Sequence, residues 1–228
     1  MYYQFPNEPG WKWLHMTTQN RKRKRRWLLV ALYLAGIALF IAPLQIQAET
    51  GQLDQTPSYQ IWIQDPYTNE SALATVSVPD YSLWNATRIT DYEDSLLTNM
   101  PPPLAILTID RMNLQVPIWN GTDDLVLNRG AGRIKGTAKI DEVGNLGLSG
   151  HRDGFFRGFK DVQMGDEIEV QTTKGVQKYE VSSITIVPKS DISPLTPSDE
   201  KIITFVTCYP FYFVGHAPKR YIVTATAK

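Results

Sequence analysis

The sequence predicts a mainly β protein: a closed barrel with one or two short helices, preceded by an N-terminal transmembrane helix. Three observations support this. Between residues 104 and 228, short apolar runs rich in β-branched and aromatic residues alternate with turn signals. Only two short segments there have a helical pattern, and a closed barrel leaves no exposed strand edges. Residues 27–46 are apolar and uncharged, which is typical of a segment that crosses a bilayer.

The N-terminal segment predicts both an anchor and its orientation. Residues 21–26 are all basic and directly precede the apolar run, and residues 1–48 carry a net charge of +6. Because flanking basic residues stay in the cytoplasm, we expect residues 1–26 to be cytoplasmic and the rest extracytoplasmic. This makes a single-pass protein of the cell (inner) membrane. A nucleic-acid patch is disfavoured because the basic run abuts an apolar one. A cleaved signal peptide stays the alternative, although Ile46-Gln47-Ala48 lacks the small-x-small cleavage pattern.

A polar linker and a helix follow the predicted anchor. Residues 47–80 are rich in Gln, Thr, Ser, Pro and Tyr with weak periodicity, which predicts an extracytoplasmic linker. The domain of residues 81–228 is predicted to start with a helix over 82–97, capped by Asp80 or Ser82. Its rough apolar face would consist of Trp84, Ile89, Tyr92 and Leu96, and the prolines at 101–103 would end it.

The predicted barrel occupies residues 104–228, a length sufficient for one core. About seven strands are expected, over 104–109, 115–119, 145–149, 167–172, 177–187, 202–207 and 221–226. Short helices are expected over 124–129 and 155–161. No internal repeat stands out.

Three reactive side chains are predicted at strand ends: Cys208, His151 and Arg220. Each has a simpler interpretation, since lone cysteines often pack as small hydrophobes and lone histidines or arginines are often surface groups. Together they form the set that cysteine acyl transfer needs, because a thiol attacks as thiolate. A single cysteine excludes an intramolecular disulfide and a Cys–His zinc cluster. His15 and His216 are interpreted as surface groups.

The segment Thr204-Phe205-Val206-Thr207-Cys208 resembles the Thr-Leu-x-Thr-Cys motif of sortases, membrane-anchored cysteine transpeptidases of bacterial surfaces. The departure is Phe205 in place of Leu. The resemblance covers about residues 80–228 and is strongest to class D and the related sortases of Gram-negative bacteria. The further matching features are Trp84, Arg88, Ile89, Tyr92, Leu125, residues 128–132, 144–145, 150–157, 208–211 and 217–220.

The resemblance implies an eight-stranded barrel and a role for each site residue. Cys208 would be the nucleophile, His151 the acid/base partner and Arg220 the stabiliser of the oxyanion or substrate carbonyl. Thr207 would bind substrate and shape the site beside the scissile carbonyl. His216 stands where a small residue is common, which blurs the assignment of the base.

The implied reaction is cleavage of an LPXTG-like sorting signal between Thr and Gly through a thioacyl-enzyme. The Thr carbonyl would pass to an amine acceptor, such as a peptidoglycan precursor or a lysine of a pilin or other surface protein. No cofactor, metal or nucleic acid is expected.

Three alternatives to this activity were weighed. An L,D-transpeptidase also uses Cys and His, but Tyr209-Pro210 replace the Arg that normally follows its Cys. Papain-like hydrolases are disfavoured because their Cys precedes their His. A non-catalytic surface assembly factor with the same barrel would have a buried, unreactive Cys208.

Overall fold

The computed structural model describes residues 58–82, 84–212 and 217–228. The predicted cytoplasmic tail (1–26), the anchor (27–46) and residues 47–57 of the linker lie outside the described residues. In the part that is described, no helix is long and apolar enough to cross a membrane.

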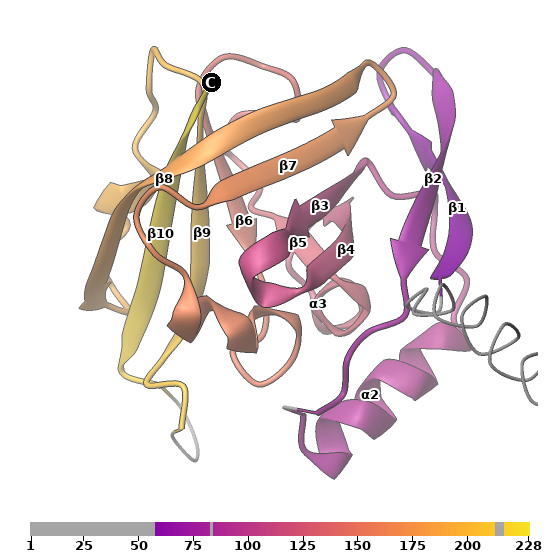
Figure 1. Cartoon of the computed structure of the whole chain (residues 1–228), viewed down its shortest axis with the longest axis horizontal. Helices are drawn as coiled ribbons and strands as arrows, with labels where there is room; N and C mark the ends of the chain where they lie inside the picture. Colours follow the sequence, from indigo (N-terminus) through magenta and orange to yellow (C-terminus); the bar gives the residue numbers. More distant parts are fainter. Residues whose placement is uncertain (1–57, 83, 213–216) are drawn as a thin grey trace, which may run out of the picture. The chain divides into compact units, whose positions relative to one another are not determined.

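A closed barrel of eight strands forms the body of the domain, as the sequence predicts (Figure 1). Around the barrel the strands follow the order β10-β8-β7-β3-β4-β5-β6-β9, and β9 closes it by pairing with β10. The strands are β3 (Ala105–Ile109), β4 (Leu114–Asn120), β5 (Ala131–Arg133), β6 (Asn145–Ser149), β7 (Glu167–Thr172), β8 (Gly175–Pro188), β9 (Ile202–Tyr209) and β10 (Lys219–Ala227).

Two neighbouring pairs in this mainly antiparallel barrel are parallel, β4 with β5 and β6 with β9. Parallel strands end at the same edge of a sheet, so β6 and β9 deliver the residues that follow them to one end of the barrel. The strand missing from the sequence prediction is β5, whose three residues are too few to show a period of two.

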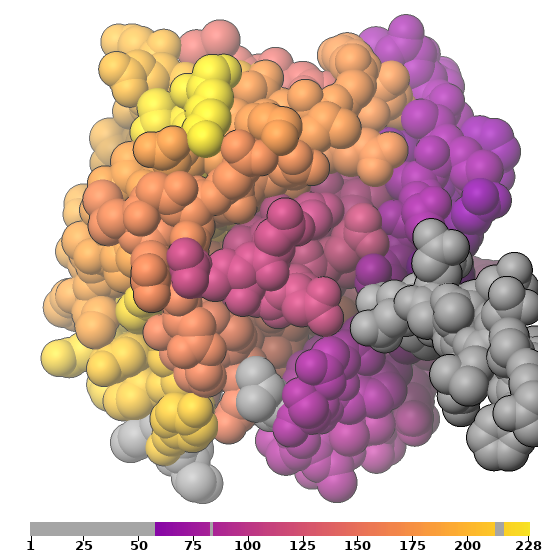
Figure 2. All heavy atoms as spheres, in the orientation of Figure 1, coloured from indigo at the N-terminus to yellow at the C-terminus, as the bar shows by residue number. Residues whose placement is uncertain are grey.

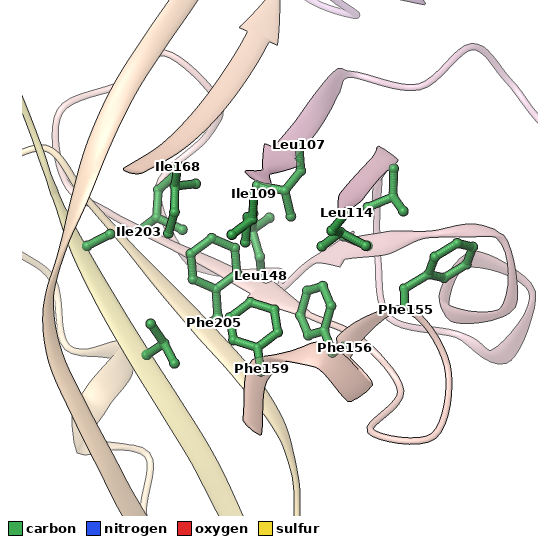
Figure 3. Packing of buried hydrophobic residues seen from close by; sticks show 14 of the residues in the cluster. Leu107, Ile109, Leu114, Leu148, Phe155, Phe156, Phe159, Ile168, Ile203 and Phe205 are labelled. Atoms are coloured by element: carbon green, nitrogen blue, oxygen red, sulfur yellow. The ribbon is translucent and has the colours of Figure 1, made fainter. Parts of the chain in front are cut away.

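Aromatic and branched side chains fill the barrel and fix the chain beside its end (Figure 3). Phe156 and Phe159, from the 3-10 helix η2 (Phe155–Asp161), pack against Phe205 of β9 with ring centroids 6.0 and 5.1 Å away. Gly150 lies under this cluster, since a Cβ there would be 2.6 Å from the Phe156 ring. The residue before His151 must therefore lack a side chain.

Two α-helices flank the barrel, α2 (Ala86–Leu96) and α3 (Asp124–Arg129). The predicted helix over 82–97 is thus shorter, and its cap is Asn85, which accepts from the Arg88 amide at 2.8 Å. Asp80 instead accepts from the Ser82 amide, a local turn before the helix. Two short 3-10 segments connect strands of the barrel: η1 (Asp110–Met112) lies between β3 and β4, and η3 (Ser193–Leu195) lies between β8 and β9.

A β-hairpin occupies most of the segment that the sequence assigns to a linker. Its strands are β1 (Ser58–Gln64) and β2 (Ser71–Ser77), which pair antiparallel. Ile63, Ala74 and Val76 are buried against Ile106 of β3, and Figure 2 shows the indigo-to-purple hairpin lying against the barrel. The linker prediction is wrong for these residues. Few apolar side chains alternate with many polar ones there, so the sequence shows only a weak strand pattern.

Candidate active site

Cys208 and Arg220 are neighbours on the outer face of the barrel. They are directly opposite in the antiparallel pairing of β9 with β10. Side chains at such positions share a face, with Cβ atoms about 4.5–5.5 Å apart. Because successive side chains alternate, Thr207 points into the barrel while Cys208 points out and is half-buried. The strand pairing therefore places a cation beside the thiol.

The parallel pairing of β6 with β9 brings His151 to the same place. Ser149 is in register with Val206, and two residues later the two chains reach His151 and Cys208. The carbonyl of His151 accepts from the amides of Gly154 and Phe156, both at 3.2 Å, which closes the chain into a tight turn. His151 is therefore held by the start of η2 rather than by a free loop.

A side-chain hydrogen bond of Thr207 connects the end of β9 to the end of β6. The Thr207 side chain is 3% exposed, and its hydroxyl donates to the carbonyl of Gly150 at 2.8 Å. The hydroxyl thus contacts the residue before His151. The hydroxyl of Thr207 can therefore affect the site by fixing the position of His151.

This bond gives a prediction. Thr207→Val keeps the shape of the side chain but leaves the buried Gly150 carbonyl unpaired, which costs about 1–3 kcal/mol of unfolding free energy. His151 should also lose its fixed position, and we expect kcat/KM to fall about tenfold or more. Urea unfolding and peptide-cleavage kinetics measure the two effects.

The matched control is Thr204→Val on the same strand. Thr204 is fully buried and its hydroxyl has no hydrogen-bond partner among the described residues. Its replacement should be neutral or stabilising, because it removes an unsatisfied polar group. Equal effects of the two substitutions would contradict a positioning role for Thr207.

An open pocket of about 510 Å³ contains all three predicted reactive side chains. Its lining residues are Arg88, Asp124, His151, Arg152, Asp153, Lys189, Cys208, Ala217 and Arg220. Arg220 donates to the backbone carbonyls of Ala217 at 3.3 Å and Lys219 at 3.0 Å. Within the described ranges, no carboxylate lies within ion-pairing distance of Arg220, so its charge is available to a bound carbonyl or oxyanion.

The surroundings of His151 favour the neutral imidazole. Burial lowers the pKa of His151 most, because an imidazolium loses solvation there, and the positive charge of Arg88 lowers it further. The carboxylates of Asp153, Asp124 and Asp91 act against this shift. None of the carboxylates that the structure describes accepts a hydrogen bond from the imidazole. A neutral ring can accept the thiol proton and later return it.

The structure thus assembles Cys208, His151 and Arg220 as expected from their positions at strand ends. His216 and His15 lie outside the described residues. Asp153 forms an ion pair with Arg88 at 3.3 Å. Sequence reasoning noted Arg88 but gave it no role, and it missed Asp124 and Lys189 as pocket residues because single surface charges carry no pattern. Across residues 58–82, 84–212 and 217–228, no cluster of three potential metal-ligating side chains is present.

Comparison with known proteins identifies the family of this domain. The family profile described as the sortase domain matches residues 107–228. Sortase D of Bacillus subtilis is 42% identical over 119 residues, which are 52% of this chain and 60% of that protein. The match therefore spans less than two thirds of this curated relative.

Solved structures give the same fold. A sortase D5 transpeptidase of Clostridium perfringens is 29% identical, with a TM-score of 0.51 over 61% of this chain and 88% of the other. Sortase C from Clostridium perfringens SM101 is 25% identical, with a TM-score of 0.51 over 62% and 82%.

Proposed function

The chain belongs to the sortase family, and from this premise we propose that it is a membrane-anchored cysteine transpeptidase. The observation that carries the proposal is the meeting of Cys208, His151 and Arg220 in one open pocket at the barrel end. Cys208 is half-buried and lines that pocket, which disfavours a structural cysteine in a non-catalytic assembly factor.

Acylation follows from the chemistry of the three groups. The neutral imidazole of His151 takes the proton of the Cys208 thiol, and Sγ attacks the carbonyl carbon of the scissile peptide bond. The negative charge that develops on the carbonyl oxygen lies near the guanidinium of Arg220, which stabilises it. The imidazolium of His151 then protonates the leaving amine, the C–N bond breaks, and a thioester remains on Cys208.

Transfer reverses these steps with a second amine. The incoming amine attacks the thioester carbonyl, His151 accepts its proton, and Cys208 leaves as thiolate. We propose a sorting signal of the LPXTG type as donor, cleaved between Thr and Gly. The acceptor would be an amine of a peptidoglycan precursor or a lysine of a pilin or other surface protein.

The choice between transfer and hydrolysis is testable. With an LPXTG-type peptide as donor, added hydroxylamine or a glycyl peptide should raise turnover and give a Thr-linked adduct in mass spectra. The physical reason is that an amine attacks the thioester faster than water does. Heat-unfolded protein serves as the control for spontaneous reaction with the nucleophile. Formation of the free acid alone, at every amine concentration, would make the protein a protease instead.

The anchor is proposed from the sequence of residues 21–46. The six basic residues resist translocation, so residues 27–46 should span the inner membrane with the barrel outside. Protease added to intact spheroplasts is expected to digest the domain of residues 81–228. Digestion only after the spheroplasts are lysed would show the reverse orientation.

A further inference from the structure

Arg88 is a partly buried cation that α2 brings into the candidate active site from outside the family match of residues 107–228. Its side chain is 14% exposed, and Nη1 donates to Oδ1 of Asn128 on α3 at 2.5 Å. Nη2 lies 3.3 Å from Oδ1 of Asp153. Nε is buried with no hydrogen-bond partner among the described atoms. A buried polar nitrogen without a partner calls for an explanation.

The arginine lies against the turn that carries His151. A Cβ placed on Gly154 would be 3.3 Å from Cδ of Arg88 and 3.7 Å from Cβ of His151. The missing side chain of Gly154 therefore lets Arg88 approach the turn. The amide of Gly154 donates to the carbonyl of His151, so Asp153 and Gly154 connect the guanidinium to the histidine through one short stretch of backbone.

The charges around the imidazole come from every neighbouring element. On the acidic side are Asp91 on α2, Asp124 on α3 and Asp153 on the turn itself. The basic and thiol groups of the pocket are Arg88, Arg152, Lys189, Arg220 and Cys208. Asn128 joins Arg88 to α3, and Asp153 joins it to the turn that carries His151.

We propose that Arg88 is a positioning residue for His151: anchored by Asn128, it holds the turn through Asp153 and places a fixed positive charge beside the imidazole. This inference rests on the proposed function in assigning His151 the acid/base role. The charge of Arg88 adds to the effect of burial in lowering the pKa of His151, and it makes the imidazolium a stronger acid towards the leaving amine.

The test is a direct titration of His151 in the full-length protein in detergent micelles. The chain has three histidines, so ¹³C-histidine labelling gives few signals, and His151→Gln identifies the relevant one. Arg88→Gln should raise the pKa of His151, because a neighbouring positive charge is removed. Arg88→Lys keeps the charge but loses the planar fork. It should leave the titration near that of wild type while lowering kcat/KM.

A second substitution distinguishes charge from structural damage. Asp153→Asn should lower the pKa of His151, and the Arg88→Gln/Asp153→Asn double variant should return towards wild type. Arg129→Gln is the matched control, since Arg129 also binds the α2 region through the carbonyls of Ser95 and Thr98 but does not line the pocket. An unchanged His151 titration in both Arg88→Gln and Asp153→Asn overturns the proposal, and so does an equal rise in Arg129→Gln.

The titration needs no substrate, which separates this inference from the proposed function. Opposite shifts in Arg88→Gln and Asp153→Asn would establish the effect of Arg88 even if no peptide were cleaved. If the peptide assay works, the acid limb of the kcat/KM profile should move to higher pH in Arg88→Gln together with the NMR titration. An acid limb that stays in place while the NMR titration moves would contradict the acid/base part of the proposal.

Discussion

Replacement of Cys208 by Ala is expected to abolish turnover of an LPXTG-type peptide and to leave the fold intact. The Cys208 sulfur forms the thioester with the acyl group, and neither His151 nor Arg220 can replace the thiol as nucleophile. The side chain is half-buried at the end of β9, and the strand pairing with β10 uses backbone groups. Thermal unfolding should therefore change little. Turnover is measured by release of the fluorogenic leaving group.

Intact-mass spectrometry adds a second readout for the same substitution. Wild-type protein mixed with peptide should carry the mass of a thioester-linked acyl group, and Cys208→Ala should not. His151→Ala should lose nearly as much turnover, because His151 is the imidazole that lines the pocket with Cys208 in the described part of the chain. Wild-type-like turnover by Cys208→Ala would exclude a thioacyl mechanism.

The barrel was largely predictable because its strands bury one face. Apolar alternation with turn signals located 145–149 and 167–172 at the residues that the structure assigns to β6 and β7. The helix over 124–129 also lies at the predicted residues, and in the structure Asp123 caps it with a side-chain oxygen. The local sequence pattern was sufficient to locate elements that do not depend on distant residues.

The misses share a different physical cause. The hairpin of β1 and β2 depends on burial against Ile106, which is 30 to 43 positions away in sequence from Val76, Ala74 and Ile63. β5 is held by pairing with β4 and β6 rather than by its own three residues. The position of Arg88 beside His151 depends on how α2 packs on the barrel. Each of these features arises from tertiary contacts, which residue spacing cannot reveal.

Arg220 gives the second large effect. Arg220→Ala should lower kcat/KM by roughly 10²–10³-fold, the usual loss for one oxyanion donor. The loss should fall mainly on kcat, because the guanidinium gains most of its interaction when negative charge develops in the transition state. Arg220→Lys should recover part of the rate, since it keeps the charge but loses the planar fork that carbonyls of residues 217 and 219 hold in place.

The neighbouring residue provides a matched control for this charge. Lys219→Ala removes the same charge from the same strand, but Lys219 is exposed and does not line the pocket. Its kcat/KM should stay within about twofold of wild type, because exposed charges away from the pocket are screened by solvent. If Arg220→Ala behaved like Lys219→Ala, the backbone pairing of β9 with β10 would have a structural role only. The oxyanion would then need a different donor, such as a backbone amide near Cys208.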